Sequence, residues 1–323
     1  MADKYIYAVA RVRALEMSLF SQAIIEQLIA MDTYKKAVQF IREKGWGDSD
    51  SSKMDEDEIL NAEVEKTWAA VSEMVDDMAV FDVIRMPDLF HNLKAAIKTV
   101  VAGETPAKVF FDNAQINGEQ MLAIVRDKAW DRLPEYMREC AVSSWETMVH
   151  AGDGQMCDAI IDRGTLNAIR AAAKKANDPL LRDYAETTVA VADIKIAVRA
   201  MKTGKNIDFM ERAMAECDTI DVDRLSAAAV AGMEEIQRYL ADTQYAEGAD
   251  ALASSASAFE RWCDNRIIET IKPQKYNPFT VGPIVAYILA RLNEIKTVRI
   301  ILTCKLNQLP EDAIRERVRE MYV

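Results

Sequence analysis

The spacing of apolar residues predicts a protein built almost entirely of helices. From Lys4 to Met31, apolar side chains recur every three or four residues, which is the period of one face of an α-helix. Asp32-Thr33 is a good N-cap, and it predicts a second helix that runs to Lys44 and ends at Gly45-Trp46-Gly47. The acidic, serine-rich segment 48–57 is expected to be a loop.

The same period continues along the rest of the chain. It predicts helices at about 58–82, 88–102, 107–114, 118–128, 134–149, 153–175, 179–203, 208–216, 222–242, 249–272, 282–307 and 310–321. Prolines are expected in the first turn of many of these helices, namely Pro87, Pro106, Pro134, Pro179, Pro283 and Pro310. Alternation with a period of two, which indicates strands, does not rise above background. We therefore expect an all-α fold.

Composition supports this fold class and limits the kinds of partner that the protein is expected to bind. Only 11 Gly and 8 Pro occur in 323 residues, so turns are few and helices should be long. The formal net charge is −12, and a field of that sign repels nucleic-acid phosphates and anionic lipid headgroups. We expect no nucleic-acid partner and no direct lipid insertion. The apolar stretch 282–306 carries Arg291 and Glu294 among its charges, which indicates a buried helix and not a membrane span.

The termini and cysteines indicate a compartment. The five cysteines are scattered, with the closest pair 17 residues apart, so a disulfide framework is not expected. The segment that follows Met1 contains an early acid and no apolar core, unlike a signal peptide. We expect a cytoplasmic protein.

A weak internal repeat has a period of about 100 residues. Its three copies centre on Lys94, Lys195 and Arg299, which are 101 and 104 residues apart. Each lies in a long predicted helix that is followed within ten residues by a short amphipathic one. Two interpretations remain at this point: a threefold duplication, or the chance alignment of helix-rich sequence.

Motifs for catalysis or metal binding are incomplete. Asp76-Asp77 resembles the start of the magnesium-binding Asp-Asp-x-x-Asp motif of isoprenoid synthases, but its third carboxylate position is Val80. A solvated helix face explains it better. Segment 48–53 resembles the start of a calcium loop, but Lys53 occupies the position of the turn glycine and Ile59 that of the bidentate glutamate. No zinc-binding histidine spacing, nucleotide-binding glycine motif or nucleophile elbow occurs. We expect no catalytic residues, no metal site and no cofactor.

Both ends of the chain carry a more specific pattern. Residues 277–302 contain Gly282-Pro283, an Ala-Tyr helix and Arg299-Ile-Ile-Leu, and the chain ends with Leu309-Pro-Glu and Arg-Glu-Met-Tyr-Val323. Together with the opening Tyr7-Ala-Val-Ala-Arg-Val-Arg-Ala-Leu-Glu16, they resemble the C subunit of the bacterial and archaeal V/A-type ATPases (ATP synthases), which is similar to the d subunit of the eukaryotic V-ATPase. The region 110–270 matches mainly in helix spacing.

The resemblance implies a fold and a role. Proteins of this family consist of three similar helical domains with pseudo-threefold symmetry in a funnel-like arrangement, which here gives boundaries 1–118, 119–219 and 220–323. The implied role is a non-catalytic connector, present in one copy, that joins the D and F subunits of the central stalk to the proteolipid rotor ring at the cytoplasmic face of the membrane. It would transmit torque for ATP-coupled proton or sodium transport. The signature positions are Arg11, Arg13, Glu16, Glu294 and Arg299, and we expect ion pairs within a domain for them.

The family pattern also has departures here. Arg291 stands where the family often has Lys, and Leu292 where it often has an acid. Two alternatives to the connector remain: an all-helical, magnesium- and diphosphate-dependent enzyme of isoprenoid-synthase type, and a helical scaffold unrelated to ATPases. Magnesium-dependent stabilisation by a diphosphate would favour the first alternative.

Overall fold

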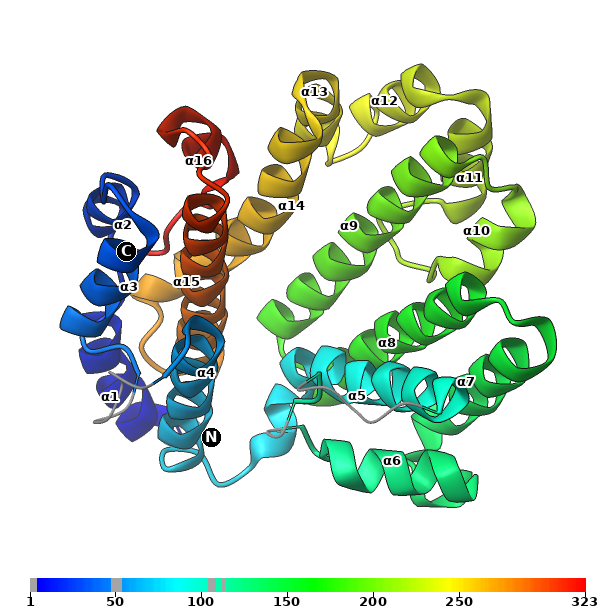
Figure 1. Cartoon of the computed structure of the whole chain (residues 1–323), viewed down its shortest axis with the longest axis horizontal. Coiled ribbons are helices and arrows are strands. Elements are labelled where there is room, and N and C mark those ends of the chain that lie inside the picture. The colour runs from blue at the N-terminus through cyan, green and yellow to red at the C-terminus, as the bar shows by residue number, and fades with distance from the viewer. Residues whose placement is uncertain (1–4, 48–53, 104–108, 112–113) are drawn as a thin grey trace. The chain divides into compact units, whose positions relative to one another are not determined.

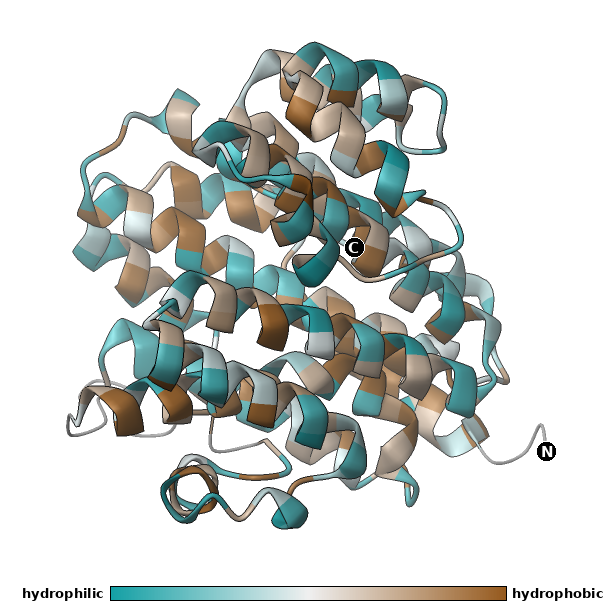
Figure 2. Ribbon diagram, turned by 90° about the vertical axis from the view of Figure 1, so that its right-hand side faces the viewer, coloured by the Kyte–Doolittle hydropathy of each residue, from teal (hydrophilic) through white to brown (hydrophobic). Residues whose placement is uncertain are grey.

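A computed structural model confirms the all-α fold (Figure 1). It describes residues 5–47, 54–103, 109–111 and 114–323, and over these residues it contains α-helices and short 3-10 or π segments but no strand. Hydrophobic and hydrophilic residues share each helix, as expected of amphipathic helices (Figure 2). Within the same residues, no helix is both long and apolar enough to span a membrane.

The helices of the described residues have the following bounds. They are α1 (Ile6–Glu16), α2 (Gln22–Ile29), α3 (Tyr34–Glu43), α4 (Glu56–Ser72), α5 (Asp82–Ala102), α6 (Gly118–Asp127), α7 (Glu135–Glu146), α8 (Gly154–Ala176), α9 (Pro179–Thr203), α10 (Ile207–Ala213), α11 (Val222–Ala231), α12 (Met233–Ala241), α13 (Ala246–Ser254), α14 (Ala256–Ile271), α15 (Gly282–Leu306) and α16 (Glu311–Arg317). The 3-10 segments are η3 (Met78–Phe81), η4 (Trp130–Arg132) and η6 (Lys272–Tyr276), and η5 (Thr147–Ala151) is a π segment.

Local capping explains many helix ends. The predicted N-cap Thr33 accepts a hydrogen bond from the backbone N–H of Lys36 at the start of α3. Asp55 and Glu58 form a capping box at the start of α4. Gly103 and Gly204 end α5 and α9 in the left-handed conformation, with φ of 67° and 64°, which glycine adopts without a Cβ clash.

Several predicted boundaries were wrong. The predicted helix 4–31 is two helices, because the chain turns after Glu16 and Ser21 begins α2, which places Phe20 in the core against Trp46. The helices predicted at 222–242 and 249–272 are each broken as well. Gly232, with φ of 128°, separates α11 from α12, and Ser255 adopts an extended conformation as the N-cap of α14.

Other corrections concern the first third of the chain. Pro87 lies inside α5 and not in its first turn, because α5 begins earlier than expected. Residues 109–111 of the predicted helix 107–114 are not helical. Asp76 and Asp77 are exposed in the turn that follows α4 and are not on a helix face. Pro106 and the proposed calcium-loop start at 48–53 lie outside the described residues.

The chain divides into two compact units. Unit 1 comprises Met1–Met78 and Asp250–Val323, and unit 2 comprises Ala79–Ala249. In unit 1, the predicted buried helix α15 contacts α1, α2, α3, α4, α14 and α16, and 18 of its 25 residues are buried. In unit 2, α8 contacts α5, α7, α9 and α10. A single central helix that packs on many sides therefore organises each unit.

This division differs from the predicted repeats. Unit 1 joins the two ends of the chain, whereas the predicted boundaries at 118 and 219 both fall within the sequence of unit 2. Compactness and sequence duplication are different properties, so the three repeats and the funnel-like arrangement remain predictions.

Candidate functional site

The five signature positions all lie in unit 1, and each forms an ion pair there. Arg13 and Glu16 of α1 pair with each other. Nη1 of Arg13 lies 2.8 Å from both carboxylate oxygens of Glu16. Its Nη2 donates to the carbonyls of Gln274 at 2.6 Å and Asn277 at 3.1 Å. Arg13 therefore fastens α1 to the turn that precedes α15.

The penultimate residue joins this arrangement. The hydroxyl of Tyr322 donates to Glu16 at 3.4 Å, and the ammonium of Lys275 lies 4.8 Å from the centre of the Tyr322 ring. Burial, with the nearby charge of Glu16, raises the pKa of Tyr322 to about 12, so its hydroxyl keeps its proton. The motifs of both chain ends thus meet in one structural cluster, which we call the terminal cluster: Arg13, Glu16, Gln274, Lys275, Asn277 and Tyr322.

The signature residue Glu294 is fully buried on α15. Its carboxylate accepts a hydrogen bond from Arg291, also buried, at 2.9 Å, and Arg291 reaches the hydroxyl of Ser18 at 2.8 Å. Burial raises the pKa of Glu294 to about 7, against the opposing effect of the Arg291 charge. This pair connects α15 to the turn after α1. Arg291 stands where the family often has Lys, and its planar guanidinium here serves two partners at once.

The remaining two signature residues form surface ion pairs. Arg11 pairs with Glu73, beyond the end of α4, at 3.0 Å, and Arg299 of α15 pairs with Asp57 of α4. Both pairs are well exposed to solvent, which screens the attraction, so each contributes little to stability. All five positions therefore hold helices of unit 1 together through contacts within the chain.

A small polar cavity lies beside the buried pair. It has a volume of about 220 Å³ and is lined by Ser18, Trp46, Glu63, Lys66 and Arg291, among others. Glu63 accepts hydrogen bonds from the backbone N–H of Gly47 at 3.0 Å and from Lys66 at 2.8 Å. Glu63 is thus held by Lys66, and Arg291 by Glu294. Sequence reasoning did not find Glu63, because its burial and its bond from Gly47 arise only when α4 packs on the turn that ends α3.

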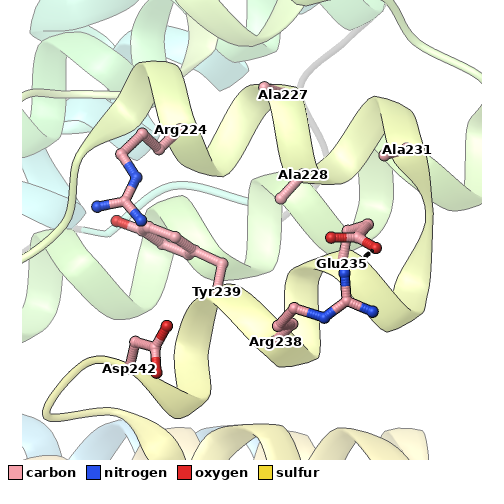
Figure 3. Close-up of a pocket in the computed structure, with 8 residues that line it drawn as sticks. All are labelled: Arg224, Ala227, Ala228, Ala231, Glu235, Arg238, Tyr239 and Asp242. Carbon is pink, nitrogen blue, oxygen red and sulfur yellow. Dashed lines mark hydrogen bonds and ion pairs between the residues drawn. The ribbon is translucent and has the colours of Figure 1, made fainter.

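Unit 2 carries a larger groove between α11 and α12, with a volume of about 420 Å³ (Figure 3). Its floor includes the small side chains of Ala227, Ala228 and Ala231. At one end, the guanidinium of Arg224 lies 5.3 Å from the centre of the Tyr239 ring, and at the other Glu235 pairs with Arg238. The small alanine side chains leave the space between these charged groups open.

The described residues offer no set of metal ligands. No group of three or more His, Cys, Asp or Glu side chains in that part of the chain could hold a metal ion. The five cysteines are free, and burial raises the pKa of Cys140 to about 12, so that thiol is not a nucleophile at neutral pH. The ring of His91 contacts the carbonyl of Val109 at 2.8 Å.

Comparisons with known proteins identify the family. The family model described as "ATP synthase (C/AC39) subunit" matches residues 8–317. The chain is 21% identical over 321 residues to the C subunit of a V-type sodium ATPase from Enterococcus hirae, covering 96% of this chain and 97% of that protein. It is 20% identical over 342 residues to the C subunit of an A-type ATP synthase from Methanocaldococcus jannaschii, covering 96% and 85% respectively.

These matches agree with the resemblance carried by the chain ends, and they extend it through the diverged middle. They do not favour an isoprenoid-synthase type of enzyme. The chain is a structural component that works with other subunits of the ATPase and does not itself carry out catalysis. The chain therefore belongs to the ATP synthase (C/AC39) subunit family.

Proposed function

We propose that this chain is the non-catalytic connector of a V/A-type rotary ATPase, joining the D and F subunits of the central stalk to the proteolipid rotor ring. The observation that carries the proposal is the family match over residues 8–317, which takes in nearly the whole chain. In this role one copy at the cytoplasmic face transmits torque between the ATP-hydrolysing head and the ion-translocating ring. The relative from Enterococcus hirae is named as part of a sodium ATPase, whereas the ion carried here is set by the ring.

The packing of unit 1 suits a part that bears torque. Its central helix α15 is buried along most of its length, and the terminal cluster joins α1 to the turn before α15 and to the C-terminal Tyr322. Close-packed helices deform little under load, because side chains in a dense core have no space to move into. A rotating force applied to such a body is therefore passed on and not absorbed.

The three proposed repeats, 1–118, 119–219 and 220–323, gain support from buried polar residues. Asn92 of α5 accepts from the N–H of Phe111 at 2.8 Å, and Asp193 of α9 accepts from the N–H of Ala215 at 3.1 Å. Both precede the repeated basic residue by two positions, and both fasten the segment that follows the long helix. In α15 the equivalent role belongs to Asn293, one turn earlier, which donates to the carbonyl of Glu320 at 3.0 Å.

Binding to purified subunits tests the connector role. We expect the full chain to form a complex with the D–F stalk in size-exclusion chromatography, and native mass spectrometry to give one copy of each. We also expect it to capture the proteolipid ring from detergent-solubilised membranes. An unrelated helical protein of equal size and net charge is the control, and both mixtures are repeated at high salt. Absence of a complex with both stalk and ring would refute the proposal.

A further inference from the structure

Unit 2 contains a second cavity, separate from the groove between α11 and α12. It has a volume of about 430 Å³ and lies among α7, α8 and α10. Its polar lining includes Glu139, Cys140 and Ser143 of α7, Arg163 and Asn167 of α8, and Arg212 of α10. The volume falls within the range of small-molecule sites, which is about 300–1,000 Å³.

The two arginines of this cavity are not held by a carboxylate at ion-pair distance in the described part of the chain. Neither Arg163 nor Arg212 forms a hydrogen bond or an ion pair there. The nearest carboxylates along α8 are already engaged, since Asp158 pairs with Lys98 and Asp162 with Lys94. Arg212 is exposed and solvated, whereas Arg163 is partly buried, so the two guanidiniums present positive charge at the mouth and at the wall of one cavity.

Of the two arginines, Arg163 is the one with a buried polar atom that lacks a hydrogen bond in the described part of the chain. Its Nε is buried and forms no hydrogen bond to any described residue, which is costly for a donor on a charged group. The carboxyl of Asp193 lies close enough to interact with the Arg163 charge. Burial nevertheless raises the pKa of Asp193 to about 8, so this carboxyl is mostly neutral at pH 7 and leaves the charge of Arg163 uncompensated.

We propose that this cavity binds a soluble small molecule that carries a phosphate group, held by Arg163 and Arg212. A guanidinium presents paired N–H donors whose geometry matches phosphate oxygens. The hydroxyl of Ser143 and the amide of Asn167 supply further donors. Glu139 is the one carboxylate among the lining residues, so the ligand should turn a hydroxyl or amine toward it. None of the five signature residues lines this cavity.

Calorimetric titration of the full chain tests the site. The probes are inorganic phosphate and magnesium-free ATP at pH 7, with ionic strength held constant by sodium chloride. We expect saturable binding of at least one probe with a dissociation constant below about 1 mM, equivalent to about −4 kcal/mol. Both R163Q and R212Q should weaken it at least tenfold. The matched control is R126Q, since Arg126 is exposed on α6 and does not line the cavity.

Each outcome decides the proposal. Arg212 is exposed, so R212Q should fold normally and carries the test even if R163Q is unstable. The proposal is overturned if neither probe binds saturably at concentrations up to about 10 mM, or if R126Q weakens binding as much as R212Q. Citrate that bound as tightly as the phosphate probes would assign the cavity to carboxylates instead.

Discussion

Replacement of Asp193 by Asn should make unit 2 more stable, and increasingly so as the pH rises. Asp193 is fully buried on α9, and within the part of the chain that the structure describes only one of its oxygens is hydrogen-bonded, to the N–H of Ala215. Burial raises the pKa of Asp193 to about 8, against the lowering effects of that N–H and of Arg163 and Arg170. The folded protein therefore retains a proton that the unfolded chain, with a pKa near 3.8, has already released.

The sign and size of the change in stability with pH follow from proton linkage. Between about pH 4 and pH 8 the folded state binds more protons than the unfolded state, so stability falls as pH rises and levels off above pH 8. Each pKa unit corresponds to about 1.4 kcal/mol, which gives at most about 6 kcal/mol over the full range and about 3 kcal/mol between pH 6 and pH 9. Asn keeps an oxygen acceptor for Ala215 and cannot ionise, so D193N removes this dependence.

The assay is urea denaturation at several pH values from 6 to 9, with hydrogen exchange of α9 amides to assign the transition to unit 2. The quantity compared is the difference in unfolding free energy between D193N and the unaltered protein, which should shift in favour of D193N by up to about 3 kcal/mol over this range. The new amide group can also change the stability by an amount that is the same at every pH, and this does not alter how the difference depends on pH. D183N is the control, because Asp183 is an exposed carboxylate on the same helix. A difference that stays level with pH would refute the reasoning.

Three further substitutions test contacts of the two units. R291A should lower the free energy of unfolding by about 3 kcal/mol at pH 8, because it leaves the ionised Glu294 buried without its cation. The loss should be smaller at pH 5, where Glu294, with a pKa of about 7, is protonated. Urea denaturation that gave equal losses at both pH values would contradict this. G164A should lower the stability measured in thermal unfolding by about 1–3 kcal/mol, because the new Cβ would lie 2.9 Å from Sγ of Cys140. Adding C140A to G164A removes that sulfur and should restore part of the lost stability. S255A should cost about 1 kcal/mol and speed hydrogen exchange in the first turn of α14, whereas S255T should not; equal exchange in both variants would argue against the cap.

Local sequence was enough to predict where the helices lie but not where they are interrupted. Pro179 and Gly204 bound α9 as predicted, since a proline start and a left-handed glycine end act within one turn of the chain. The break after α1 was missed because the apolar period runs through it unchanged. There the decisive contact is long-range in sequence, as Phe20 packs on Trp46. The broken helix at 222–242 could have been found, because Gly232 was visible in the sequence.

The sequence by itself determined the fold class, the family and the five signature positions, because apolar period and terminal motifs are properties of adjacent residues. Tertiary structure alone decided what those positions do. Arg13 holds the turn at Gln274 and Asn277, more than 260 residues away, and Glu294 is buried against Arg291. It also decided which polar atom is buried without a hydrogen bond among the described residues, as at Nε of Arg163, and which carboxyl is buried, as at Asp193. Desolvation and ion pairing depend on neighbours that only folding brings together, so they cannot be predicted from the order of residues in the sequence.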